Sequence, residues 1–283
     1  MSAGDLLLVG TALIAAAVNG GLGYGFSSIT VPVALLFRQS RALNPALVLL
    51  ELFINALALV ANRRGLAAVL SRVWPLVLGA VPGVVLGSLL LVSASPGRLK
   101  LFTFAALLPL ILVQSAGIRR PIRRERAAAV PAGAALGFLY GATTISGPPL
   151  ALLFNNQGLT RDEFRAALSL FRIAESSCTA LAYLALGLFS TESLRLSGQL
   201  APAVLVGLPL GYALLRKLPA ETFRRTCMAA DALLVGFGLA RSAIAQEVAT
   251  PALAWTGFAA VVCIEAALVV SYLRGRAGEE AAT

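Results

Sequence analysis

The chain has 283 residues, of which 58% are hydrophobic and only 13% are charged. A soluble domain carries about 25% charged residues, and here runs of about twenty apolar residues recur from end to end, which predicts a polytopic helical membrane protein. The net charge of +10 comes from basic residues at the ends of these runs. It therefore indicates a positive-inside topology rather than nucleic-acid binding.

The titratable residues exclude several kinds of chemistry. The chain has no histidine, which removes histidine-based metal sites, general bases and proton relays. The three cysteines have no metal-site or redox spacing, so we expect packed thiols at Cys178, Cys227 and Cys263. We accordingly expect no metal, no cofactor and no catalytic residues.

The first apolar run, residues 6–37, is interrupted in its centre at Gly20–Gly25. This leaves arms of about 12–15 residues, which at about 1.5 Å per residue are too short to cross a hydrocarbon core of about 30 Å. A re-entrant helix pair fits these lengths, and a single long kinked span is the alternative.

The rest of the chain shows the same order twice, with one interrupted segment followed by three full spans. The N-terminal repeat, 1–118, has its broken segment at 6–37 and spans at about 44–62, 73–93 and 99–117. A basic linker at 119–127 leads to the C-terminal repeat, 128–245, with a broken segment at 128–155 and spans at about 166–189, 199–215 and 226–244. One extra span in 246–273 and a polar tail, 274–283, follow.

A local alignment supports a duplication. The stretches GLGYGFSSITVP (21–32) and YGATTISGPP (140–149) match at one constant offset, which pairs Gly25 with Gly141 and Pro32 with Pro148. If both broken segments are re-entrant, most basic residues fall on the side of the 119–127 linker, whereas full crossings divide them almost evenly. The re-entrant topology gives two inverted repeats with an external N-terminus and a cytoplasmic C-terminus.

The two broken segments are the candidate substrate site. Helix N-termini at such breaks present free N–H groups and positive dipole ends, which suit anions. Close helix packing through small residues is the competing interpretation. The candidate substrate-binding residues are Gly23, Gly25, Ser27, Ser28, Thr143, Thr144, Ser146, Gly147 and Arg172.

Charged residues within the spans give a second set of candidates. Arg172 lies on a polar stripe of its span, where it can contact an anion or pair with Glu175 or with Glu51. The span at 44–62 carries a matching stripe with Asn44, Glu51, Asn55 and Asn62. The coupling or charge-pair candidates are Glu51, Asn55, Glu175 and Arg165, while Asp231 and Glu265 are expected to form structural pairs.

These stretches also resemble a known family. GGLGYGFSSITVP, GFLYGATTISGPPLALLF and EFRAALSLF are similar to segments of the TauE/SafE family, the sulfite-exporter or TSUP group. The resemblance implies a duplicated helical fold in the cytoplasmic membrane and transport of small, often sulfur-containing anions. Gly147, Pro148, Pro149 and Arg165 match family-type positions.

We therefore expect a secondary transporter, and an exporter in particular, of a small anion such as sulfite or an organosulfonate. Its expected partners are that anion and the lipid bilayer of the inner membrane, with protons as the candidate coupling ion and no nucleic acid. The alternatives are an anion channel or a transporter of small organic acids. An intramembrane lipid phosphatase is disfavoured because histidine is lacking.

Overall fold

The structure is a computed structural model that describes residues 3–117, 125–155, 157–214 and 220–281. Over these residues the chain is helical, with no β-strand. The first half contains α1 (Ala3–Leu22), α2 (Phe26–Ala34), α3 (Ser40–Ala61), the short 3-10 helix η1 (Arg63–Gly65), α4 (Leu66–Ser93) and α5 (Pro96–Ser115). The second half contains α6 (Glu125–Thr143), α7 (Gly147–Asn155), α8 (Arg161–Ala185), α9 (Thr191–Leu214), α10 (Ala220–Ala245) and α11 (Pro251–Ala281).

The predicted class, an all-α polytopic membrane protein, is confirmed. Seven described helices are long and apolar enough to cross a membrane. They include α1, which the sequence treats as half of a broken segment, and they leave out α8, which has 25 residues. The linker 119–127 lies mostly outside the described residues.

Each broken segment consists of a long helix followed by a short one. α1 has 20 residues and α2 has 9, while α6 has 19 and α7 has 9. The arms expected for the first segment, about 12–15 residues each, are therefore wrong. Gly20 lies within α1 and packs closely on α9, where a Cβ would lie 2.3 Å from the carbonyl oxygen of Leu208. The break lies later, at Gly23 and Gly25, whose φ angles are +86° and +111°.

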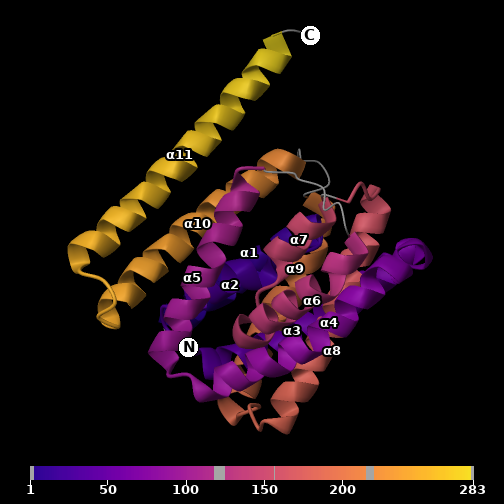
Figure 1. Cartoon of the computed structure of the whole chain (residues 1–283), viewed down its shortest axis with the longest axis horizontal. Helices are drawn as coiled ribbons and strands as arrows, with labels where there is room; N and C mark the ends of the chain where they lie inside the picture. The colour runs from indigo at the N-terminus through magenta and orange to yellow at the C-terminus, as the bar shows by residue number, and fades with distance from the viewer. Residues whose placement is uncertain (1–2, 118–124, 156, 215–219, 282–283) are drawn as a thin grey trace.

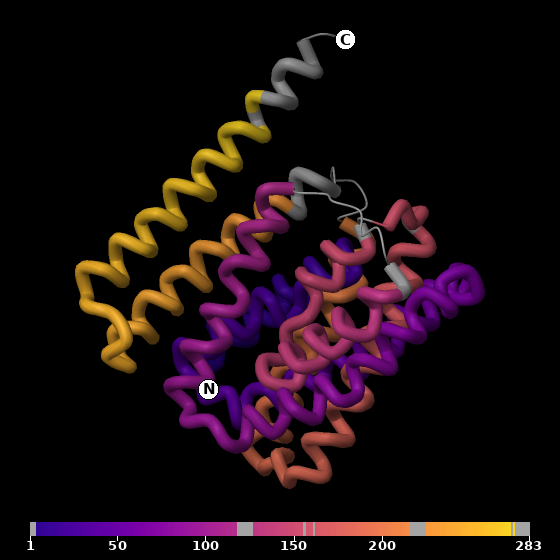
Figure 2. Tube along the Cα trace, in the orientation of Figure 1, coloured from indigo at the N-terminus to yellow at the C-terminus, as the bar shows by residue number. Residues whose placement is uncertain are grey.

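Contacts at the ends of the bundle show how these segments run. Asp5, near the start of α1, forms an ion pair with Arg38, just after α2. The chain therefore returns to the end of the bundle where it began, as the tube in Figure 2 allows the reader to follow. Ala128 of α6 and Phe154 of α7 line one small pocket with Arg72, which lies near the start of α4, beyond the full length of α3. These contacts support two re-entrant pairs that enter from opposite ends.

Two pairs of helices pack together across the boundary between the halves. α4 packs along α6, and α1 packs along α9 (Figure 1). Glycines allow this approach, because a Cβ on Gly83 would lie 2.1 Å from the carbonyl oxygen of Ala134 and one on Gly211 would lie 1.8 Å from that of Ala17. Two repeats of opposite orientation would produce these two equivalent contacts. The contacts therefore support the inverted repeat, which remains a proposal.

The helix bounds differ from the expected spans mainly at the ends. α8 begins at Arg161 rather than 166 because Thr160 and Glu163 form a capping box. α9 begins at Thr191 rather than 199. α11 packs mainly against α10 and extends away from the rest of the bundle (Figure 1). It continues to Ala281, so most of the predicted polar tail, 274–283, is helical.

Candidate substrate site

The two short helices begin next to each other. A Cβ on Gly147, the first residue of α7, would lie 3.7 Å from the backbone nitrogen of Gly25, the N-cap of α2. The same Cβ would lie 3.4 Å from Nη1 of Arg172 in α8. Two positive helix ends and a guanidinium group therefore converge on one point inside the protein.

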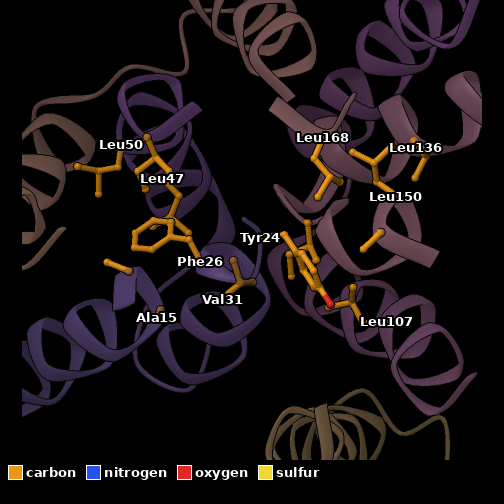
Figure 3. Close-up of a cluster of buried hydrophobic side chains, with 14 of the residues drawn as sticks. Ala15, Tyr24, Phe26, Val31, Leu47, Leu50, Leu107, Leu136, Leu150 and Leu168 are labelled. Carbon is orange, nitrogen blue, oxygen red and sulfur yellow. The ribbon is translucent and has the colours of Figure 1, made fainter. Parts of the chain in front are cut away.

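The hydrophobic core holds the first break in place. Tyr24 and Phe26 flank Gly25 and point to opposite sides of the break (Figure 3). Both side chains are buried in the central hydrophobic cluster, which also contains Leu47 of α3 and Leu150 of α7. Because these anchors lie on either side of the left-handed Gly25, the start of α2 is fixed in direction as well as in position.

Glu51 of α3 connects four helices at this point. Its Oε1 accepts hydrogen bonds from Oγ of Ser27 and from Nη2 of Arg172, each at 2.6 Å. Its Oε2 accepts one from Oη of Tyr140, also at 2.6 Å. Glu51 is 0% exposed and Arg172 is 2% exposed. Three donors, one of them cationic, compensate for the burial of this carboxyl group.

Arg172 is only partly satisfied. Of the two carboxylates that the sequence offered as its partner, Glu51 forms the ion pair. Nη1 and Nε of Arg172 have no hydrogen-bond partner within the described part of the chain. Glu175 lies on the neighbouring face of α8, where its Oε2 accepts a hydrogen bond from Ser146 and its Oε1 has no partner there. The face of the guanidinium group turned toward Gly147 thus keeps free donors.

The two polar stripes predicted on α3 and α8 face each other. Nδ2 of Asn55 lies 3.4 Å both from the carbonyl oxygen of Arg172 and from Oγ of Ser176. Nδ2 of Asn62 donates to Oγ of Ser169 at 3.1 Å. These hydrogen bonds and the Glu51–Arg172 ion pair form a buried polar seam between the halves.

Two side chains cap the interrupted helices of the opposite half. Nη2 of Arg165 in α8 donates to the carbonyl oxygen of Gly21 at the end of α1, at 2.9 Å. Nδ2 of Asn44 in α3 donates to the carbonyl oxygen of Ala142 at the end of α6, also at 2.9 Å. Arg165 therefore places a positive charge at the negative end of α1 and helps to hold the first break.

The remaining hydroxyl candidates donate hydrogen bonds to backbone carbonyl oxygens. Oγ of Ser28 donates to the carbonyl oxygen of Gly25, and Oγ1 of Thr143 donates to that of Leu139. Oγ1 of Thr144 donates to the carbonyl oxygen of Thr143. Of the predicted hydroxyls, Ser27 donates to Glu51 and Ser146 donates to Glu175. A substrate-binding role for any of them remains a prediction.

The sequence did not identify Tyr140 as part of the site, although Tyr140 opens the second interrupted motif. The local alignment of the two halves paired Gly25 with Gly141. Gly141, however, lies within α6 and not at the second break. The helix starts suggest another register. One spacing separates the first residues of α2 and α7, the first residues of α3 and α8, and Glu51 from Arg172. In this register Glu51 and Arg172 are counterparts.

The family model described as sulfite exporter TauE/SafE matches residues 8–239. The chain belongs to the TauE/SafE family. The match includes both breaks, Glu51, Arg172 and most of α10, and it ends before α11. No curated protein and no solved structure matches the chain. As a TauE/SafE protein, the chain is a membrane anion transporter and not an enzyme.

Proposed function

We propose that this TauE/SafE protein is a secondary transporter that exports a small sulfur-containing anion, such as sulfite or an organosulfonate, across the cytoplasmic membrane. The observation that carries the proposal is the meeting of the α2 and α7 N-termini beside the unpaired nitrogens of Arg172. Buried N–H donors that have no acceptor, at two helix N-termini and on a guanidinium group, suit an anion that has lost its hydration shell.

The donors around this point are unequal. The first N–H groups of an α-helix have no intrahelical acceptor, and in α2 they belong to Phe26, Ser27 and Ser28. The first turn of α7 lacks two such donors, because Pro148 and Pro149 have no N–H group. An anion would therefore take its hydrogen bonds mainly from α2 and Arg172. A sulfite or sulfonate group, with three oxygens, can accept from both at once.

The arrangement also supports alternating access. In inverted-repeat transporters, one half rocks against the other around a site at the repeat interface. Here α2 and α7 bring one break from each half to that interface, and Glu51 and Arg172 join α3 of the first half to α8 of the second. We place the N-terminus outside and the C-terminus in the cytoplasm, following the distribution of basic residues.

Ligand-dependent thermal stabilisation of the purified protein tests this function. The panel contains sulfite, thiosulfate, sulfate, sulfoacetate, acetate and phosphate at fixed ionic strength. A ligand at a hundred times its dissociation constant stabilises the folded state by about 2.7 kcal/mol. We expect a selective shift with a sulfur anion. A shift with acetate alone would favour small organic acids, and no shift with any anion would contradict the proposal.

A matched pair of variants locates the binding. The Gly147→Ala methyl group would lie at contact distance from Arg172 and from the α2 N-cap, so the fold should survive while the space for the anion is filled. Gly10→Ala in α1 is the control, because no atom lies within 4 Å of its added Cβ. Gly147→Ala should lose the ligand-induced shift and Gly10→Ala should keep it. An unchanged ligand-induced shift in Gly147→Ala would show that the anion does not bind beside Gly147.

A further inference from the structure

Asp231 lies in the middle of α10, outside the cluster formed by Glu51 and Arg172. It is 1% exposed. Neither of its carboxyl oxygens has a hydrogen-bond partner in the part of the chain that the structure describes. The structural pairing that the sequence predicted for this residue stays a prediction.

The other buried carboxylates show how unusual this is. Glu51 accepts from three donors, Glu175 accepts from Ser146, and Glu265 of α11 accepts from Oγ of Ser115 at 2.7 Å. An ionised carboxylate without donors is costly inside a protein and a membrane, so such a group is neutralised instead. Asp231 is therefore a buried carboxylate whose surroundings favour a bound proton.

The helices packed against α10 supply no cation to Asp231. They are α2, α5 and α11, and α2 has no charged residue. Lys100 of α5 lies near Arg241, ten residues along α10 from Asp231 and so about 15 Å away. The titratable and charged side chains that the structure describes on these helices are Arg98 and Lys100 on α5, Cys263, Glu265, Tyr272 and Arg274 on α11, and Arg225, Cys227 and Arg241 on α10 itself.

The hydroxyl of Ser28 in α2 lies close to the carboxyl of Asp231. In the structure Ser28 donates its proton to the carbonyl oxygen of Gly25. Its oxygen can accept from a protonated Asp231, whereas donation to an ionised Asp231 would require the hydroxyl to leave Gly25. Ser27, the preceding residue, donates to Glu51. The first turn of α2 thus borders the anion site through Ser27 and Asp231 through Ser28.

We propose that Asp231 is a proton-binding site of the transport cycle, linked to the anion site through the first turn of α2. The inference rests on the proposed function. A proton from water on one side of the membrane forms an O–H bond with a carboxylate oxygen. The same bond breaks when the rocking of the halves exposes Asp231 to water on the other side. An anion held by the N–H groups of α2 shifts this turn and so couples the two events.

Proteoliposomes containing a trapped pH-sensitive dye test the coupling, with sulfite and sulfoacetate as substrates. Asp231→Asn should keep the anion-induced thermal shift and the exchange of internal for external anion. It should lose proton movement with net transport, by at least about tenfold. Glu265→Gln is the matched control, because it removes a buried carboxylate that has a donor, and it should retain both activities.

Infrared spectroscopy tests the site without any substrate. Wild-type protein should show the carbonyl stretch of a protonated buried carboxyl group, and Asp231→Asn should lose that band while Glu265→Gln keeps it. Wild-type coupling in Asp231→Asn, an unchanged band, or transport driven by sodium without proton movement would each overturn the inference. An absence of anion binding in wild type, with the band still assigned to Asp231, would count against the proposed function alone.

Discussion

The two breaks bring their short helices to the same point by different chemistry. At the first break, the left-handed backbone angles belong to Gly23 and Gly25, which tolerate them without steric cost. At the second, the left-handed residue is Thr144, with φ of +60°. α2 then begins with free N–H groups, whereas α7 begins with two prolines soon after its first residue. The difference teaches that the two breaks share a geometry while only one is rich in anion donors.

The counterpart residues Glu51 and Arg172 show the same specialisation. Near a twofold axis between repeats, a side chain meets its own counterpart. Identical charged residues would repel each other there, in a medium that screens charge poorly. The opposite charges of Glu51 and Arg172 instead form a buried ion pair, with the cation on the half whose short helix has fewer donors.

Breaking this pair should have the largest effect on stability. Arg172→Met leaves Glu51 buried without its cationic donor, and we expect a loss of about 3–5 kcal/mol in the free energy of unfolding. Glu51→Arg and Arg172→Glu should each be similarly harmful, while the double variant Glu51→Arg, Arg172→Glu restores an opposite pair. Unfolding in detergent, analysed as a double-mutant cycle, measures the coupling. If either single variant is as stable as the wild type, the pair does not hold the halves together.

The contact between α4 and α6 should be the next most sensitive. A Cβ in Gly83→Ala would lie 2.1 Å from the carbonyl oxygen of Ala134, so the two backbones must separate. We expect destabilisation of about 1–3 kcal/mol, as for overpacked cores. Gly10→Ala adds the same methyl group in open space within α1, so it should be neutral or slightly stabilising when both are measured by thermal unfolding. Equal effects of the two variants would show that the close approach is not required.

Substitutions at the breaks should separate the two geometries. Gly25→Ala forces an L side chain into φ of +111°, with its Cβ 3.1 Å from Val18. It should destabilise the fold by about 1–2 kcal/mol. Thr144→Gly should change stability by less than about 1 kcal/mol, because relief of the left-handed strain is offset by added backbone freedom in the unfolded chain. The melting temperatures of both variants test this asymmetry, and a larger loss from Thr144→Gly would reverse it.

Local patterns predicted the helical class, the two broken segments and the facing stripes of α3 and α8, because composition and helical spacing lie within a single segment. Which carboxylate pairs with Arg172 could not be predicted, because Glu175 is close in sequence while Glu51 reaches Arg172 only through tertiary packing. The glycines were similarly ambiguous. Gly20 and Gly25 look alike in the sequence. In the structure, however, Gly20 lies within α1 against the backbone of α9, whereas Gly25 has a left-handed φ angle and forms the break.

The smallest effect we predict concerns the start of α8, far from both breaks. The backbone N–H and hydroxyl of Thr160 donate to Oε2 of Glu163, each at 2.9 Å, and these hydrogen bonds hold the pKa of the Glu163 carboxyl below its usual value of 4.5. Because the folded-state pKa is lowered, the stabilisation is present above the unfolded value and is lost as the pH falls through the folded-state pKa. Wild type should therefore exceed Glu163→Gln in melting temperature at neutral pH, by a small margin that closes on acidification. Thr160→Ala, which removes one of the donors, should show a weaker pH dependence than wild type. A margin that stays constant or widens toward acid would mean that the capping box does not depend on the charge of Glu163.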